Sequence, residues 1–186
     1  MRSIVKGVAV TVGMCSLLQT AAAHETFVAQ NADNQLIFVL DEHLEVPVPL
    51  DVSAFPGIPG FAADEPGLVA LEESIDGADP INPLSEIELI FLGGDPEIQM
   101  WGEGADDPLA PGETLYLGLA PFHVHAIWNI HNGQLGGVYE LNFQFRDRSG
   151  IAMTSEPVSL SFTAVPEPGS LLMLAGAATM MLRRRR

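Results

Sequence analysis

The sequence predicts an all-β domain: an antiparallel two-sheet sandwich of about eight strands, with a long Pro/Gly/Asp-rich loop. Two observations lead to this fold class. Side chains in residues 138–146 and 157–164 alternate between apolar and polar, as they do in strands that bury one face. Proline and glycine divide the chain into short segments, and a series of short strands separated by turns is typical of a sandwich.

The alternation is clearest toward the C-terminal end of the domain. Leu141, Phe143 and Phe145 share one face of their segment, and polar side chains occupy the other. Leu160 and Phe162 alternate with serine and threonine in the same way. In chain order, the expected strands are residues 26–30, 35–40, 86–92, 97–101, 114–119, 124–130, 138–146 and 157–164.

The longest stretch without a strand signal is residues 47–83. It is rich in proline, glycine and aspartate, which favour turns and irregular backbone. We therefore expect a long loop there, in which residues 67–74 are compatible with one short helix.

The N-terminal end has the pattern of a secretory signal peptide. Arg2 and Lys6 precede an apolar stretch, and small residues follow it up to Ala23. Cleavage after Ala23 makes His24 the first mature residue, and cleavage one residue earlier also fits. A lipoprotein signal at Cys15 is the alternative. In either case the domain itself contains no cysteine, so it uses neither disulfides nor thiolate ligands.

The C-terminal end joins three segments in a fixed order: a Pro-Glu-Pro motif, an uncharged apolar run at 171–182 and four arginines at 183–186. The apolar run enters a bilayer, and the arginines stay on its cytoplasmic side. A permanent span needs roughly 20 residues, so a run of about a dozen suits a transient signal. A C-terminal amphipathic or core helix with a basic end is the alternative.

Residues 165–186 resemble the PEP-CTERM sorting signal, which the membrane enzyme exosortase recognises. The resemblance implies that Pro166, Glu167 and Pro168 form the processing motif. At the other end of the chain, Ala23 is the processing residue of the signal peptide. Exosortase and the secretion machinery are then transient partners. The protein would insert transiently in the inner membrane and reach the cell envelope or the exterior. The implied organisation is signal peptide at 1–23, sandwich at 24–164 and sorting signal at 165–186.

The charge of the domain excludes one class of partner. Residues 24–165 contain 23 Asp and Glu but only Arg146 and Arg148 as bases, a net charge of 2 − 23 = −21. Nucleic acid is excluded, because phosphate binding needs clustered lysine and arginine. The charge favours solubility outside the cell and attracts cations. A merely solvated acidic surface is the alternative explanation.

The histidines are the best candidates for chemistry. His123 and His125 stand about 6.5 Å apart on a strand, so they can converge on one metal ion. His131 would lie about 20 Å from His125 on a straight strand. It joins the pair only if the chain bends, as Asn132 and Gly133 would allow. All five histidines of the chain lie in the domain: His24, His43, His123, His125 and His131.

Further ligands must come from His43 or His24. If His24 is the mature N-terminus, its α-amino group and its ring can chelate a metal together. A ligand set of imidazoles and carboxylates suits zinc or copper. The alternative is that the imidazoles are hydrogen-bonded at the sheet edge or stacked on Trp128 and Trp101.

Residues 120–165 also resemble surface-anchored "choice-of-anchor" domains, and PEP-CTERM proteins that the zinc-uptake regulator represses. The resemblance rests on the His-x-His segment followed by Trp128, and on Tyr139 and Phe143 after Gly137. It implies a role linked to zinc, in which His123 and His125 carry over.

Three functions follow from the sequence. The first is a non-enzymatic envelope or extracellular-matrix protein, processed at its Pro-Glu-Pro motif, whose sandwich is also able to bind a metal. The second is a dedicated zinc or copper binding protein. The third is a metalloenzyme with an open coordination position at His123 and His125. The sequence contains no nucleophile elbow, phosphate-binding glycine loop or zinc-protease helix motif.

Overall fold

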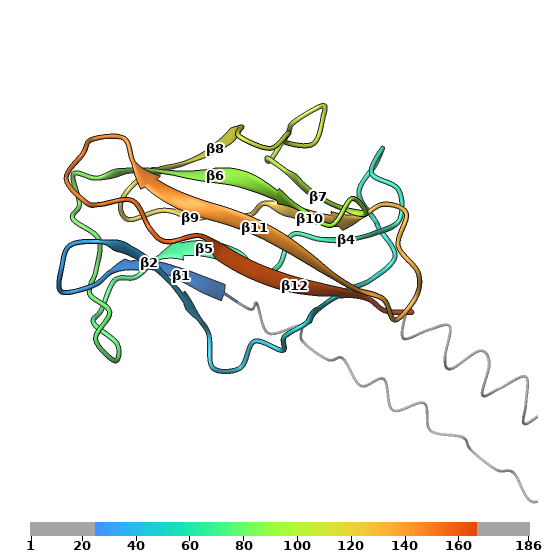
Figure 1. Ribbon diagram of the computed structural model, residues 1–186, viewed down its shortest axis with the longest axis horizontal. Coiled ribbons are helices and arrows are strands. Elements are labelled where there is room, and N and C mark those ends of the chain that lie inside the picture. Colours follow the sequence, from blue (N-terminus) through green and yellow to red (C-terminus); the bar gives the residue numbers. More distant parts are fainter. Residues whose placement is uncertain (1–24, 167–186) are drawn as a thin grey trace, which may run out of the picture.

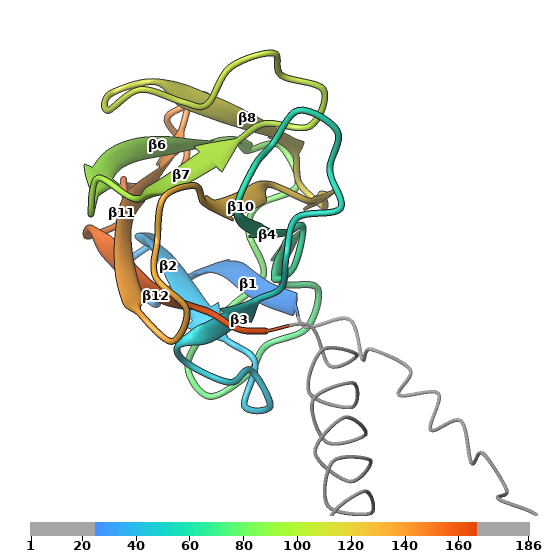
Figure 2. The same cartoon turned by 90° about the vertical axis from the view of Figure 1, so that its right-hand side faces the viewer.

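The computed structural model describes residues 25–166, and this part of the chain is all-β, as predicted. Its twelve strands form three hydrogen-bonded sheets in a sandwich-like arrangement (Figure 1). Seen end-on, the sheets surround a shared interior (Figure 2). The sequence predicted about eight strands in two sheets, so the structure confirms the fold class and adds short strands and a third sheet.

The five-stranded sheet contains most of the strands that alternation predicted. Its order is β3-β12-β11-β6-β8, and all its pairs are antiparallel except β12 with β3. Every second residue of β11 is buried from Leu141 onward, which is the period of a strand with one face on the core. The strands are β3 (Val48–Leu50), β6 (Glu86–Gly94), β8 (Thr114–Leu119), β11 (Val138–Asp147) and β12 (Val158–Ala164).

Two smaller sheets complete the sandwich. One has the order β2-β1-β5-β9, and its β1/β5 pair is parallel. The other has the order β4-β10-β7 and is antiparallel. The first comprises β1 (Glu25–Gln30), β2 (Leu36–Leu40), β5 (Gly67–Ala70) and β9 (His123–Val124). The second comprises β4 (Phe61–Ala63), β7 (Ile98–Trp101) and β10 (Ile127–Ile130).

Residues 47–83 are more regular than the long loop that the sequence predicted. They contain β3, β4 and β5, and β5 occupies residues 67–70, where a short helix was expected. These strands are three or four residues long, yet they bury Leu50, Ala62 and Leu68. Burial of these apolar side chains in the shared core favours extended pairing over helix.

The described residues contain no helix that is long and apolar enough to cross a membrane. The signal peptide predicted at 1–23 and the apolar run predicted at 171–182 both lie outside the described residues.

The predicted strand at 124–130 is wrong in one respect, because the chain leaves the sheet between Val124 and Ile127. The cause lies in the facing segment. Residues 61–70 run antiparallel to residues 123–130, with Leu68 opposite Val124 and Ala63 opposite Trp128. Pro66 has no N–H to contribute to this ladder, so pairing stops on both segments and resumes with a shift of one residue.

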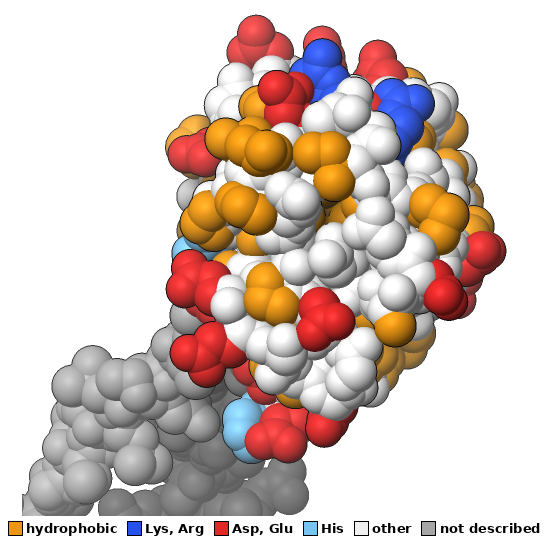
Figure 3. All heavy atoms as spheres, turned by 90° about the vertical axis from the view of Figure 1, so that its left-hand side faces the viewer, with side chains coloured by type: hydrophobic (Ala, Val, Ile, Leu, Met, Phe, Trp, Pro, Cys, Tyr) orange, Lys and Arg blue, Asp and Glu red, His pale blue; other side chains and the backbone are white. Residues whose placement is uncertain are grey.

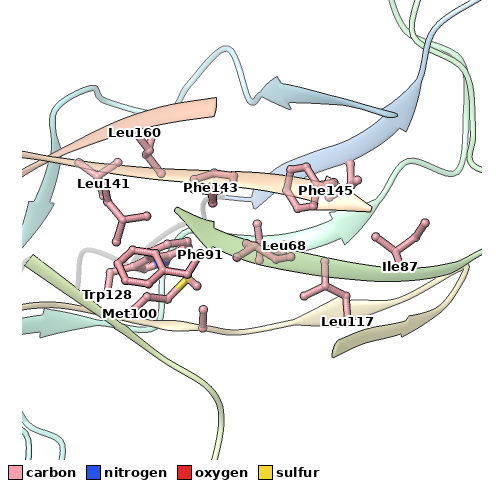
Figure 4. Packing of buried hydrophobic residues seen from close by; sticks show 14 of the residues in the cluster. Leu68, Ile87, Phe91, Met100, Leu117, Trp128, Leu141, Phe143, Phe145 and Leu160 are labelled. Atoms are coloured by element: carbon pink, nitrogen blue, oxygen red, sulfur yellow. The ribbon is translucent and has the colours of Figure 1, made fainter. Parts of the chain in front are cut away.

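The core is rich in aromatic side chains. Trp128 stacks on Phe162, with ring centroids 5.2 Å apart, and Phe143 lies edge-on to Phe145 at 5.5 Å. Aromatic pairs at these separations stabilise a core beyond the area that they bury. Figure 4 shows side chains from all three sheets meeting in this cluster, among them Leu68, Ile87, Phe91, Met100, Leu117, Trp128, Leu141, Phe143, Phe145 and Leu160.

Both arginines of the domain lie beside the Glu88 carboxylate on the five-stranded sheet. Glu88 is almost fully buried, and Arg146 donates to it from the neighbouring strand at 2.5 Å. The Arg148 side chain lies 3.8 Å from the same carboxylate and stacks over Tyr116, 5.5 Å from the ring centre. On the face shown in Figure 3, the blue basic side chains gather near the top, while red acidic side chains extend over the surface.

Asp147, at the end of β11, organises the turn that follows it. Its carboxylate accepts hydrogen bonds from the Ser149 hydroxyl and from the backbone N–H groups of Glu86, Ser149, Ile151 and Ala152. Burial alone raises the pKa of Asp147, but the hydrogen bonds from Ser149 and Ala152 outweigh it. The pKa therefore lies below its ordinary value.

Candidate functional site

The candidate site forms where the ladder between residues 61–70 and 123–130 is interrupted. The interruption leaves backbone carbonyls without strand partners, and side chains of the facing segment bind two of them. The Trp128 indole donates to the Pro66 carbonyl at 3.1 Å, and His125 Nδ1 lies 3.0 Å from the Asp64 carbonyl. The buried Pro66 carbonyl needs such a partner, whereas the hydrogen bond to Asp64 lies at the surface and orients the ring of His125.

The interruption brings His123 and His125 side by side. Their ring centroids are 4.7 Å apart and the ring planes differ by 33°. Both rings lie over Gly67 of β5: a Cβ at this glycine would be 3.3 Å from His123 Nε2 and 3.2 Å from His125 Cε1. The absence of a side chain at Gly67 therefore leaves the space in which the two rings meet.

Two carboxylates flank the pair. Glu25 Oε1 lies 3.9 Å from His123 Nε2, and Glu65 Oε1 lies 3.9 Å from His125 Nδ1. The hollow beside His123 is also lined by Glu72 and Glu73. The imidazole side chains are 50% and 36% exposed, which leaves them accessible to a small cation. The negative charge around them raises the local concentration of such ions.

The hydrogen bond of His125 determines which of its two ring nitrogens keeps a lone pair for binding a ligand. A carbonyl oxygen accepts but cannot donate, so in the neutral ring Nδ1 carries the proton that it shares with Asp64. Nε2 then keeps its lone pair. A histidine that donates from one nitrogen to a backbone carbonyl and presents the other is the usual arrangement of a metal ligand.

Of the other histidines that the structure describes, neither His43 nor His131 joins this pair. His43 follows β2, and its 78% exposed side chain lies 3.4 Å from Glu42. His131 follows β10 and donates its backbone N–H to the Glu97 carbonyl. His24 lies outside the described residues.

The structure thus brings His123 and His125 together and does not add His43 or His131 to them. Within residues 25–166, no three His, Cys, Asp or Glu side chains are arranged to hold a metal ion. A metal centre at these histidines therefore stays a prediction. The alternative given for the imidazoles applies in its hydrogen-bonded form, because His125 Nδ1 contacts the Asp64 carbonyl. The two imidazoles lie against each other, and Trp128 is buried in the core.

Sequence reasoning missed Glu25, Glu65 and Gly67. Glu25 and Glu65 are two among many acidic residues, and their spacing carries no signal. The Glu-Pro-Gly order at 65–67 is the one local cue, since proline interrupts a ladder and glycine permits close approach. It becomes informative only when the register of β5 against β9 is known.

Comparison with known proteins identifies the C-terminal segment of the chain. A family model for a C-terminal sorting signal matches residues 164–186, beginning at the last residue of β12. That model is the PEP-CTERM protein-sorting motif, so the resemblance predicted from the sequence is confirmed. The motif implies export to the cell envelope or surface through exosortase. No curated protein and no solved structure matches the chain.

Proposed function

We propose that the sandwich is a non-enzymatic domain of the envelope or extracellular matrix, which exosortase processes at the Pro-Glu-Pro motif. The position of the motif supports this most directly. The Val165 N–H donates to the Leu50 carbonyl at 3.0 Å, and the motif begins with the next residue, Pro166. A processing enzyme therefore meets the motif immediately after the sheet ends. The strongly acidic surface also suits a domain exposed to the exterior.

Replacing Pro166, Glu167 and Pro168 together with alanine will block processing, because the change removes the motif and leaves the sandwich intact. We expect the wild-type protein from the envelope or medium to lack residues 183–186 by intact-mass measurement, and the variant to retain them. Glu103→Ala changes an exposed carboxylate far from the motif in the sequence, and it should be processed normally. Recovery of wild-type protein that still carries the four arginines would contradict the proposal.

Metal binding by His123 and His125 is the second candidate function. The observation that favours it is the contact between the two imidazoles, of which His125 is held through Nδ1 while His123 Nε2 lies 3.9 Å from Glu25. The nitrogen donors suit zinc or copper, and the flanking carboxylates offset the charge of a divalent ion. The same site would serve a storage protein, a delivery protein or a metalloenzyme.

Metal titration of residues 24–165 tests this function. The fragment is suitable because every residue of the main core lies between Val28 and Ala164. We expect micromolar or tighter binding of zinc or copper, and a loss of at least about 100-fold in His123→Ala/His125→Ala, since both imidazoles are removed. His43→Ala is the matched control and should bind as the wild type does. Equal affinity in the double variant would exclude the site.

A further inference from the structure

The two outer faces of the sandwich differ in chemistry. In β11 of the five-stranded sheet the outward positions are polar, as at Glu140, Asn142 and Gln144. A sheet face that lies in water is ordinarily polar in this way. The outward positions of the four-stranded sheet are mostly apolar instead, although they lie outside the main core. They include Phe27, Ala29, Ile37, Val39 and Val69.

An arm of the chain, residues 71–79, covers part of this apolar face. Two backbone hydrogen bonds of 2.9 and 2.8 Å join Gln30, at the end of β1, to Asp79. Ala78 of the arm is buried in a small apolar cluster separate from the main core. Ile75 of the same arm is 44% exposed. The arm therefore covers only part of the face and leaves apolar side chains open beside it.

Two adjoining hollows lie on this face beside the arm. One has a volume of about 580 Å³ and the other of about 470 Å³. Phe27 and Ile75 line both of them, so the two hollows form one groove. Contiguous apolar surface that is open to solvent marks an interaction site. The lining of this apolar groove includes Phe27, Ile37, Val39, Val69, Leu71 and Ile75.

Carboxylates are concentrated along the apolar groove. Each of its two hollows is lined by three acidic residues, whereas three other hollows of the described residues have one each. Neither Arg146 nor Arg148 lines the groove, so its charge is strongly negative. The acidic residues are Asp41, Glu42 and Asp76 in the larger hollow and Glu25, Glu72 and Glu73 in the smaller, beside the imidazoles of His43 and His123.

We propose that the apolar groove binds a basic amphipathic peptide segment of another protein. Its apolar side chains lie on the floor of the groove, and its lysine or arginine side chains lie against the carboxylates. Charge complementarity selects this partner, because six carboxylates repel an acidic segment. A second copy of the domain lacks the required charge, since Arg146 and Arg148 both lie beside Glu88. The proposal does not depend on metal binding.

The test titrates residues 24–165, in metal-free buffer, with three labelled synthetic peptides of about 18 residues, or five helical turns. The first arranges leucine and lysine in the helical period, the second has the same composition in scrambled order, and the third replaces lysine with glutamate. A domain of this charge attracts any cationic peptide, so the scrambled peptide is the essential control. We expect the first peptide to bind at least about tenfold more tightly than the second, and the third not to bind. Equal binding of the first two would overturn the proposal.

A pair of variants with the same change in charge locates the site. Ile75→Lys places a positive charge in the groove and should weaken binding of the first peptide by about tenfold, because an apolar contact is lost. Leu84→Lys changes a side chain that is 69% exposed and does not line the groove, so it should have less than about a threefold effect. Thermal unfolding should be the same for both. Equal losses in the two variants would show that net charge alone attracts the peptide.

A second pair of variants tests the carboxylates. Glu72→Gln/Glu73→Gln should weaken binding by about 3- to 10-fold at low salt, and less at high salt. Glu103→Gln/Asp107→Asn neutralises two exposed carboxylates that do not line the groove, and it should have a much smaller effect. Equal effects of the two pairs would contradict the proposed contact between these carboxylates and the peptide.

Phosphatidylcholine vesicles distinguish a peptide from a membrane as the partner. We expect no binding to them, because the carboxylates along the groove would lose water at a bilayer. Binding to the vesicles that Ile75→Lys abolishes would assign the groove to a membrane surface and overturn the proposal.

Discussion

Replacing Trp128 with alanine is expected to lower the free energy of unfolding by about 3–5 kcal/mol, the range for large aromatic residues in cores. Trp128 is fully buried and contacts the aromatic cluster, with its ring centre 5.2 Å from that of Phe162 and 6.2 Å from that of Phe143. The substitution also leaves the Pro66 carbonyl without its indole donor. Denaturant unfolding of residues 24–165, monitored by far-ultraviolet circular dichroism, measures the loss.

Two variants show which part of this loss comes from packing. Trp128→Phe keeps an aromatic ring but removes the donor to Pro66, so we expect a loss of about 1–3 kcal/mol. Trp101→Ala removes a half-buried tryptophan whose indole has no hydrogen-bond partner, and it should cost less than half as much as Trp128→Ala. A loss below about 1 kcal/mol in Trp128→Ala would contradict the central position of this residue in the core.

Asp147→Ala is expected to cost at least about 3 kcal/mol, because hydrogen bonds to a charged acceptor are each worth about 1.5–3 kcal/mol and several are lost together. The backbone N–H groups of Ile151 and Ala152 would lose their acceptor, so the turn between β11 and β12 should open first. Hydrogen exchange at these two amides measures this local effect. Unchanged protection of both would contradict the role given to the carboxylate.

The charge of Asp147 should also make stability depend on pH. Its pKa is lower in the folded state than in the unfolded state, so its contribution is complete above the ordinary pKa of aspartate. The contribution is lost as the pH falls from about 4 through the folded-state pKa. The advantage of the wild type over Asp147→Asn should therefore shrink between pH 6 and pH 3. Asp33→Asn, at an exposed turn, is the control and should show little change.

The sequence predicts the longer strands well and the short ones poorly. In β11 and β12 the apolar side chains recur at every second position over seven or more residues, so their period is clear. Strands β3, β4 and β5 are too short to show a period, and only tertiary burial makes them strands. The third sheet arises in the same way, because the break after Val124 depends on Pro66, which is distant in the sequence.

The candidate site can be predicted only in part, because some of its residues are brought together by contacts between segments that are distant in the sequence. The spacing of His123 and His125 is local, so the sequence indicates that they can meet. The approach of Glu25 depends on a parallel β1/β5 register, and that of Glu65 depends on the interrupted ladder. Neither of these arrangements can be predicted from the spacing of the acidic residues in the sequence. Likewise, the separation of His131 from the pair follows from a break that lies before Ile127 rather than at Asn132.

The pairing of both arginines with Glu88 has a consequence for many copies displayed together. The domain carries a net charge of 2 − 23 = −21, and its two positive charges are confined to one place on the five-stranded sheet. Copies held side by side would form a layer of fixed negative charge, which electroneutrality fills with mobile cations. The osmotic pressure of these ions would draw in water and keep the copies apart. Such a layer would swell in dilute medium and contract in salt.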